Sequence, residues 1–219
     1  MVVKIKTTGK RIGGGFSTVG FARIGEATSS LTGTTLEYTD NERRQLRSYV
    51  TDIRIRPAVE SDAERFLCLW DALDTETQFM LFEPDERKAT LESQKSRLAN
   101  AENSSYVQIL VLEDRASDCL AGFCAGRRNT NYRDKHTLEV VIGIRQSYTG
   151  KAWGSKLLTE LEQWASGIGV RRLELCVMVT NLRGIALYQK CGFSIEGTKK
   201  DAVYLRTGFV DEYMMAKFM

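Results

Sequence analysis

The chain has 219 residues, of which 42% are hydrophobic and 27% are charged. This length and composition predict one globular domain, or one domain with an appendage, and exclude wholesale disorder. No run reaches the roughly 18 apolar residues of a membrane span, and the start of the chain lacks the apolar run of a signal peptide. The lone histidine, His136, excludes zinc sites built on paired histidines, and we expect no metal. Five cysteines without a C-x-x-C pair predict reduced, mostly buried thiols of a cytoplasmic protein: Cys68, Cys119, Cys124, Cys176 and Cys191.

The net charge of +3 is unevenly distributed along the chain. Residues 1–50 contain 8 basic and 4 acidic side chains, a charge of +4, which leaves −1 for residues 51–219. The first segment also holds 7 of the 18 glycines. We therefore expect a Gly/Ser/Thr-rich basic N-terminal extension over 1–50 and a folded domain over 51–219, whose near-neutral charge argues against a nucleic-acid-binding core. An alternative makes the domain a scaffold and the extension a tether to nucleic acid or a membrane.

The predicted elements begin directly after the extension. Alternating residues predict a strand over Asp52–Ala58, and Ser61 or Asp62 can begin a helix with apolar residues at helical spacing. A second helix and three strands follow, at Asp85–Ala101, Tyr106–Glu113, Cys119–Arg128 and His136–Arg145. The chain then continues with a helix, a strand, a helix and a final hairpin, at Lys151–Ser166, Leu173–Val179, Arg183–Cys191 and around Thr207–Gly208. This order predicts an α/β (α+β) fold with a mixed sheet covered by helices on both faces.

The start of the helix after His136–Arg145 carries the clearest sign of a binding site. Small residues leave the amides of its first turn uncovered: Gly150, Ala152, Gly154 and Ser155. Free N–H groups and the positive end of the helix dipole together favour a phosphate or pyrophosphate. Small residues at a helix start also serve close packing, so spacing alone leaves both interpretations open.

A second motif makes the pattern specific. Asn181 follows the next predicted strand, and Tyr188 comes seven residues later within Asn181–Phe193. Together with Ile142–Ser155, this segment resembles the Gcn5-related N-acetyltransferase (GNAT) family, and the resemblance covers about residues 53–219. It implies a mixed, mostly antiparallel sheet of about seven strands. It also implies an N-acetyltransferase that uses acetyl-CoA as co-substrate.

The resemblance also assigns cofactor-binding residues. Backbone groups of the strand at Ile142, Gly143 and Ile144 would hold the pantetheine arm like an added strand. The pyrophosphate would lie on the loop and first helical turn, formed by Thr149, Gly150, Lys151, Ala152, Trp153, Gly154 and Ser155. Asn181 and Tyr188 would complete the cofactor side of the site. An amide near Ile142 would stabilise the oxyanion that forms when the amine attacks the thioester.

The same resemblance assigns two catalytic residues. Glu139 is the expected general base, acting through water, and its alternative is a strand glutamate that faces solvent or pairs with an arginine. Tyr188 is the expected proton donor to the departing thiolate, and its alternative is an aromatic residue packed on the sheet. His136 can relay protons, although a surface or capping role is favoured. Direct attack needs no cysteine, so Cys176 and Cys191 are expected to pack as small hydrophobic residues.

Two departures from the family pattern keep a second function open. Thr149 and Ala152 stand where the pyrophosphate loop commonly has a long polar residue and a glycine, and Gly184 replaces the usual alanine after the asparagine. A catalytically degenerate acyl-CoA-binding module is therefore the alternative to an enzyme. The resemblance implies a small-molecule or peptide amine as acceptor, with no nucleic acid and no membrane. The motifs identify neither this acceptor nor the oligomeric state, so a homodimer stays open.

Overall fold

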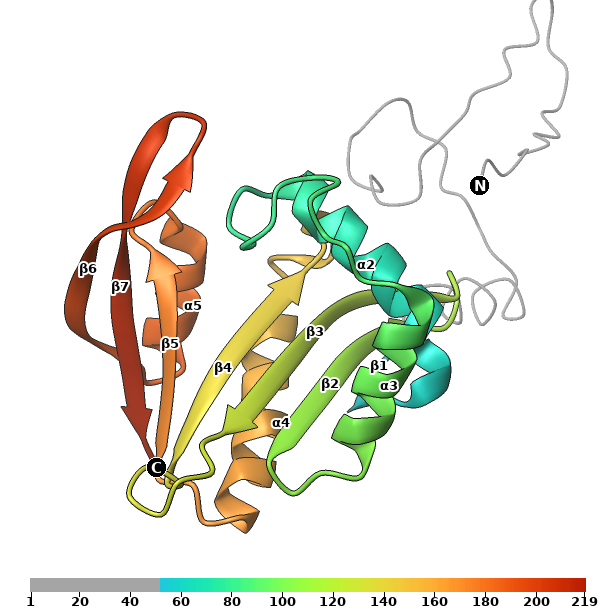
Figure 1. Ribbon diagram of the computed structural model, residues 1–219, viewed down its shortest axis with the longest axis horizontal. Helices are drawn as coiled ribbons and strands as arrows, with labels where there is room; N and C mark the ends of the chain where they lie inside the picture. Colours follow the sequence, from blue (N-terminus) through green and yellow to red (C-terminus); the bar gives the residue numbers. More distant parts are fainter. Residues whose placement is uncertain (1–51) are drawn as a thin grey trace, which may run out of the picture. The chain divides into compact units, whose positions relative to one another are not determined.

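The computed structural model describes residues 52–219, and the predicted extension over 1–50 lies outside that range. Seven strands form one sheet in the order β1-β2-β3-β4-β5-β7-β6 (Figure 1). The strands are β1 (Ile53–Pro57), β2 (Val107–Asp114), β3 (Cys119–Arg128), β4 (Thr137–Ile144), β5 (Arg172–Met178), β6 (Ser194–Leu205) and β7 (Gly208–Phe218). The helices are α2 (Ala63–Glu76), α3 (Leu91–Glu102), α4 (Trp153–Gly167) and α5 (Leu182–Lys190), with short 3₁₀ turns η1 (Glu60–Asp62) and η2 (Gln146–Tyr148). This confirms the predicted order of elements.

The sheet is antiparallel except at its centre. β4 and β5 run parallel, and their pairing is confined to three residue pairs that end at Glu139 and Glu174. β5 then pairs with β7 over seven residues, and β4 pairs with β3 over seven. The two central strands therefore diverge beyond Glu139, as Figure 1 shows. The predicted mixed, mostly antiparallel sheet is confirmed.

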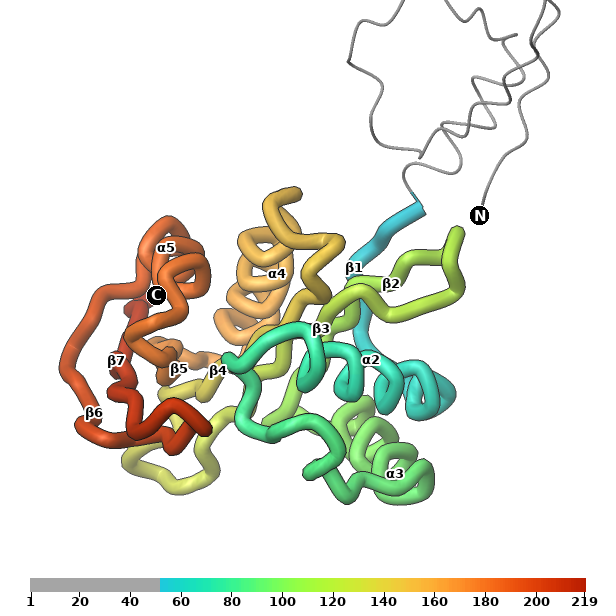
Figure 2. The backbone as a smooth tube through the Cα atoms, turned by 90° about the horizontal axis from the view of Figure 1, so that it is seen from above, coloured from blue at the N-terminus to red at the C-terminus, as the bar shows by residue number. Residues whose placement is uncertain are grey.

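Helices cover the two faces of this sheet (Figure 2). On one face α2 and α3 pack over β2 and β3, with Phe66 and Leu98 fully buried in that interface. On the other face α4 packs over β2 and β3 and contacts α5, around a core that includes Leu138, Leu157 and Leu161. Helices α2 and α3 do not extend over β5, so part of the sheet remains uncovered on their side.

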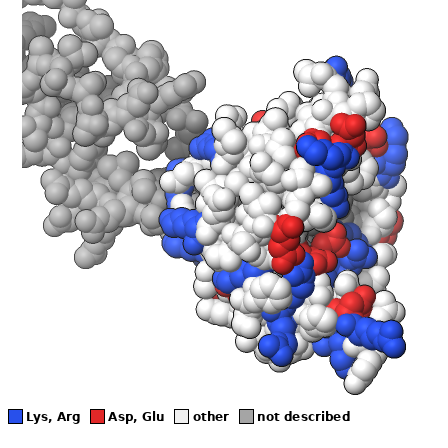
Figure 3. All heavy atoms as spheres, turned by 90° about the vertical axis from the view of Figure 1, so that its left-hand side faces the viewer, with Lys and Arg blue, Asp and Glu red and all other residues white. Residues whose placement is uncertain are grey.

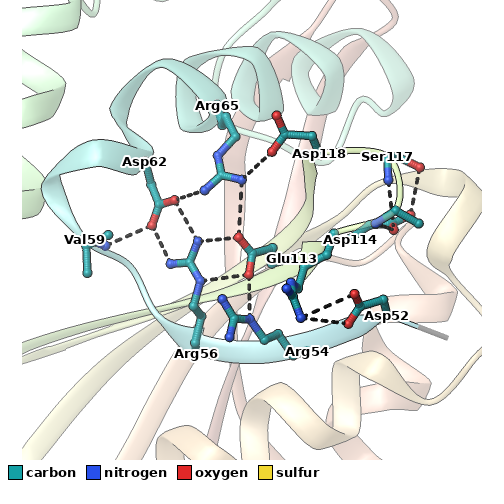
Figure 4. Close-up of polar contacts among 12 residues, drawn as sticks. Asp52, Arg54, Arg56, Val59, Asp62, Arg65, Glu113, Asp114, Ser117 and Asp118 are labelled. Carbon is teal, nitrogen blue, oxygen red and sulfur yellow. Dashed lines mark hydrogen bonds and ion pairs between the residues drawn. The ribbon is translucent and has the colours of Figure 1, made fainter. Parts of the chain in front are cut away.

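A charged network attaches β1 to α2 and β2 (Figure 4). Arg56 donates to the carboxylates of Asp62 and Glu113 at 2.6 and 2.8 Å, and Arg65 donates to Asp62 at 2.6 Å. Arg54 adds a bond of 2.6 Å to Glu113. Hydrogen bonds from Arg56 are the main cause that lowers the pKa of Glu113 to about 2. Because Asp62 and Glu113 are buried, removal of one of these arginines would leave a desolvated carboxylate with fewer compensating charges.

Two sequence predictions differ from the structure. The second helix begins at Leu91 and not at Asp85, because Thr90 caps it by accepting from the Ser93 amide at 3.2 Å while Asp85 has a left-handed φ of 66°. The prediction of mostly buried cysteines is wrong: Cys124 is buried, but Cys68 and Cys176 are exposed. Cys176 alternates with the buried Leu175 and Val177 of β5 and therefore points to the uncovered face.

Basic and acidic side chains are interspersed on the outer face of β6 and β7 (Figure 3). Lys200 pairs with Asp211 at 2.7 Å, and Arg172 pairs with Glu196. Neighbouring opposite charges compensate one another, so this face carries no extended field of one sign. Within residues 52–219, no helix is both long and apolar enough to cross a membrane.

Candidate active site

A single cleft of about 2140 Å³ runs through the place where β4 and β5 diverge. Its lining comes from both faces of the sheet, including α2 and α3 on one side and the beginning of α4 and α5 on the other. We call it the central cleft. Every predicted cofactor-binding residue except Lys151 lines it, as do Glu139 and Tyr188. His136 lies outside it, exposed at the opposite end of β4.

The backbone of β4 has a fixed alternation across this cleft. The Asn129 amide donates to the Thr137 carbonyl, and the Arg145 amide donates to the Ala121 carbonyl, so the odd-numbered residues of β4 form the hydrogen-bonded pairs with β3. The even-numbered residues Ile142 and Ile144 therefore direct their N–H and C=O groups toward β5, which no longer pairs with them. Two β4 residues thus offer strand-like hydrogen-bonding groups to the central cleft.

Gly143 serves the site in a different way. By the same alternation its backbone bonds to Phe123 of β3. A Cβ atom at this position would lie 2.8 Å from Leu73 Cδ1 and 2.9 Å from Phe123 Cε1. The glycine therefore lets α2 and β3 approach β4 closely on the α2 side of the sheet.

The loop before α4 is shaped by two left-handed residues. Gly150 has a φ of 75° and Ala152, the N-cap of α4, has a φ of 62°. The bond from the Lys156 amide to the Ala152 carbonyl begins the helix, so the amides of Trp153, Gly154 and Ser155 have no partner within α4. Together with the helix dipole, these groups form an anion-binding end that faces the central cleft.

Gly154 also has a packing role. A Cβ there would lie 2.7 Å from Leu187 Cδ2 and 3.6 Å from Ile144 Cδ1. Small size at this position is therefore required for the contact between α4 and α5, whatever the amides bind. Both interpretations of the glycine-rich helix start remain supported by the structure.

Two contacts fix the loop between β4 and α4, and sequence reasoning missed both. The Glu76 carboxylate at the end of α2 accepts from Arg145 at 3.0 Å and from the Gln146 amide at 2.7 Å. The Tyr148 hydroxyl donates to Asp114 at 2.6 Å. The partners lie far apart along the chain, so their spacing carries no sequence signal. They hold the loop against two separate elements of the fold.

Asn181 acts as the N-cap of α5. Its Oδ1 accepts from the Gly184 amide at 2.9 Å. A Cβ at residue 184 would lie 2.7 Å from the Asn181 Nδ2 atom, so the glycine gives this capping side chain room. The Asn181 side chain lines the central cleft and keeps its amide N–H groups available there.

Tyr188 lies on the α4–α5 side of the sheet. Its ring packs 5.9 Å from that of Phe193, centroid to centroid, within the buried core. Burial, with a smaller contribution from Cys124, raises the pKa of Tyr188 well above its ordinary range, so the hydroxyl stays protonated at neutral pH. Within residues 52–219 no hydrogen bond contributes to this shift, and the residue lines the central cleft. The Tyr188 ring can therefore pack against Phe193 while its hydroxyl is available as a proton donor.

Glu139 lies on the opposite side of the sheet from Tyr188. It shares the odd-numbered face of β4 with Gly143, which points toward α2. Its Oε2 accepts from Arg127 Nη2 at 2.7 Å, and the two side chains are 51% and 72% exposed. The pairing that sequence reasoning kept as an alternative is thus present, and so is the access to solvent that a base acting through water requires.

The fold and the central cleft are those of a known class of enzyme. Comparisons with known proteins identify this class. Residues 69–193 match the family described as the acetyltransferase (GNAT) family. The chain belongs to this family of acetyltransferases.

Individual relatives agree with this assignment. An acetyltransferase of the GNAT family from Streptococcus pneumoniae is 30% identical with a TM-score of 0.73, over 77% of this chain and 100% of that one. The L-amino acid N-acetyltransferase AaaT of Escherichia coli is 34% identical over 86 residues, which are 39% of this chain and 53% of AaaT. The chain thus spans about half the length of that relative. The structure of yncA from Salmonella typhimurium with acetyl-CoA shares the fold, with 17% identity and a TM-score of 0.66 over 77% of this chain and 94% of that one.

Side chains that could bind a metal are not grouped in this fold. Within residues 52–219, no cluster of three or more His, Cys, Asp or Glu side chains has the geometry to hold a metal ion. The lining of the central cleft instead combines apolar, uncharged polar and charged side chains with the backbone groups described above.

Proposed function

We propose that this protein transfers the acetyl group of acetyl-CoA to a primary amine by direct attack. The observation that carries the proposal is the divergence of β4 and β5 after Glu139, which turns the backbone of Ile142 and Ile144 into the central cleft beside the free amides of α4. A pantetheine arm bonded to β4 there would replace the missing strand, and its pyrophosphate would reach Trp153–Ser155. The acetyl-CoA named with yncA, a protein of the same fold, supports this choice of co-substrate.

The chain's own residues then have distinct tasks. The Ile142 amide donates to the thioester oxygen as negative charge develops there. The amine nitrogen bonds to the carbonyl carbon, the carbon–sulfur bond breaks, and the amine proton passes through water to Glu139. Tyr188 donates a proton to the departing sulfur from the other side of the sheet. Substrate amine and cofactor sulfur thus approach β4 from opposite faces, which matches the positions of Glu139 and Tyr188.

A base is needed because the acceptor amine is protonated at neutral pH. A lysine-like amine with a pKa of about 10.4 is neutral in only about one molecule in 2,500 at pH 7. Glu139 can accept that proton only if its pairing with Arg127 leaves one oxygen accessible to water. An Arg127→Gln variant separates the two roles of Glu139. It should retain activity if Glu139 is the base and resemble Glu139→Gln if the ion pair is what matters.

The acceptor and the domain boundary are part of the proposal. The name of AaaT places L-amino acids among the amines to be tested, beside polyamines and peptides. We propose that residues 51–219 form the whole catalytic domain in a cytoplasmic protein, so a chain lacking residues 1–50 should bind acetyl-CoA as the full chain does. Loss of binding would show that the extension completes the site.

The second candidate is an acyl-CoA-binding module without turnover, which the departures at Thr149 and Ala152 favour. The experiment that separates the two uses the purified full chain with acetyl-CoA and a broad panel of amines. Calorimetry measures acetyl-CoA binding, and a thiol reagent follows free CoA. Binding with amine-dependent thiol release supports the enzyme. Binding without release across the panel supports the module, and absence of binding contradicts both.

A further inference from the structure

The α2–α3 side of the central cleft contains two arginines that lie against the same tryptophan. The guanidinium carbons of Arg87 and Arg97 lie 4.3 and 4.8 Å from the Trp70 ring centroid. Arg87 is neutralised, because its Nε and Nη2 donate to the buried Asp74 carboxylate at 2.8 and 3.0 Å. Within residues 52–219, no carboxylate pairs with Arg97. Two positive charges, on Arg87 and Arg97, and one negative charge, on Asp74, therefore leave one uncompensated positive charge in the cleft.

The surroundings of Arg97 are unfavourable for its charge. Burial, followed by the positive charge of Arg87, lowers the pKa of Arg97. The side chain nevertheless remains accessible to solvent and lines the central cleft. Its guanidinium carbon lies 4.8 Å from the Trp70 ring centroid and 5.6 Å from the Phe66 ring centroid, and these contacts with ring faces leave its N–H groups free to donate. A fork held in this way matches a carboxylate or a phosphate through two parallel hydrogen bonds.

Aromatic side chains connect this arginine to β4. The Phe66 ring lies 5.4 Å from the Phe123 ring, centroid to centroid. Phe123 pairs with Gly143 of β4 and approaches it closely. Arg97 is therefore on the face that carries Glu139, whereas the free amides of α4 lie at the other face. This position belongs to the acceptor's side of the cleft and not to the pyrophosphate's side.

We propose that Arg97 binds an anionic group, a carboxylate or a phosphate, on the acceptor whose amine is acetylated. The inference rests on the proposed acetyl transfer and names the acceptor as an acidic amine. Asn100, three residues after Arg97 on α3, lines the same cleft, and its side-chain amide can donate to the same group. The single uncompensated charge matches one anionic group. The neighbouring Arg87 already pairs with the Asp74 carboxylate, and Arg97 can bind an acidic group of the acceptor in the same manner.

The test, in the full chain, compares amines that carry an acidic group with amines of the same length that lack it. The probes are the ω-amino acids from glycine to 6-aminohexanoate, O-phosphoethanolamine, and the alkylamines of the same length that lack the acid. Thiol release with acetyl-CoA gives kcat/KM for each pair, and calorimetry into CoA-saturated protein gives binding without turnover. The alkylamine lacks the charge-assisted hydrogen bond that the acid can form with Arg97. For at least one pair, kcat/KM and binding should therefore be about tenfold to a hundredfold higher with the acid than with its alkylamine. The better class, carboxylate or phosphate, identifies the group.

Variants assign that preference to one side chain. Arg97→Gln should remove the preference for the acid, and Arg97→Lys should retain part of it, because lysine keeps the charge without the fork. The matched control is Arg115→Gln, since Arg115 is exposed beside Asp52 outside the cleft, and it should keep the preference. Thermal unfolding verifies that each variant folds, and Arg97→Lys carries the test if Arg97→Gln does not.

Three results would overturn the inference. One is a parent protein that binds no acid better than its alkylamine, and another is a preference that survives Arg97→Gln. The third is an Arg97→Gln variant that weakens acetyl-CoA alone, which would make the cofactor the source of the anion. Absence of thiol release with every amine would contradict the proposed function instead. The calorimetric preference would still decide the role of Arg97 in that case.

Discussion

Gly154→Ala tests whether the start of α4 is constrained by packing as well as by binding. The added Cβ would lie 2.7 and 3.2 Å from the two terminal methyl carbons of Leu187, so the Leu187 side chain must shift within the contact between α4 and α5. Overpacking of this kind costs about 1–3 kcal/mol, against a gain of up to about 1 kcal/mol because alanine favours a helix over glycine. We expect a net loss of about 1–2 kcal/mol in the free energy of unfolding, measured by urea denaturation.

Two variants make this prediction specific. Gly167→Ala changes the same residue type in the last turn of α4, where no atom lies within 4 Å of the added Cβ, so it should leave stability unchanged or raise it by up to about 1 kcal/mol. Leu187→Ala removes the clashing methyl groups, so the double variant with Gly154→Ala should be more stable than the two separate losses predict. A Gly154→Ala protein as stable as the parent would refute the packing argument and leave amide exposure as the reason for the glycine.

Four other predictions concern catalysis and stability. Tyr188→Phe keeps the ring packed on Phe193 and should lower kcat about 100-fold with little change in acetyl-CoA affinity; an unchanged kcat would contradict the proton-donor role. Glu139→Gln should lower activity most at low pH, where the amine is protonated, and a pH–rate profile parallel to that of the parent would contradict the base role. Ala152→Gly should raise the free energy of unfolding by about 0.5–1 kcal/mol, because it relieves a left-handed backbone, whereas a less stable variant would show that the strain is absent. The lowered pKa of Glu113 stabilises the fold above its ordinary pKa of 4.5, and this contribution is lost as the pH falls from 4.5 toward 2; Glu113→Gln should flatten the acid unfolding curve over that window, and an equally steep curve would contradict it.

The order of elements was predictable because alternation and helical spacing are local properties of the sequence. Cys119–Arg128 is a strand with the predicted bounds, and the four other strands for which bounds were predicted begin and end within one residue of them. The second helix was placed six residues too early because Asp85 resembles a helix start, whereas the capping pair Thr90 and Ser93 decides it. Cysteine burial was mispredicted because residue type does not reveal which face of β5 a helix covers.

The proposed cofactor side of the site could be predicted from the sequence because it consists of contiguous backbone. Ile142–Ser155 is a strand, a loop and a helix start, so the spacing of its residues along the sequence is enough to predict the site. The acceptor side depends on contacts across the chain, such as Glu76 with Arg145 and Arg97 with Trp70. Trp70 is largely buried, yet its ring also lines the cleft beside two arginines. Only the fold reveals that second role.

Amide hydrogen exchange with and without acetyl-CoA tests the central claim that the cofactor occupies the opening between β4 and β5. Before binding, the Gly143 amide is already bonded to β3, while those of Ile142 and Ile144 face the cleft. We expect acetyl-CoA to slow exchange at Ile142, Ile144 and the first turn of α4, and to leave Gly143 nearly unchanged. Protection that appears elsewhere, or equally at all three β4 residues, would contradict this account of the site.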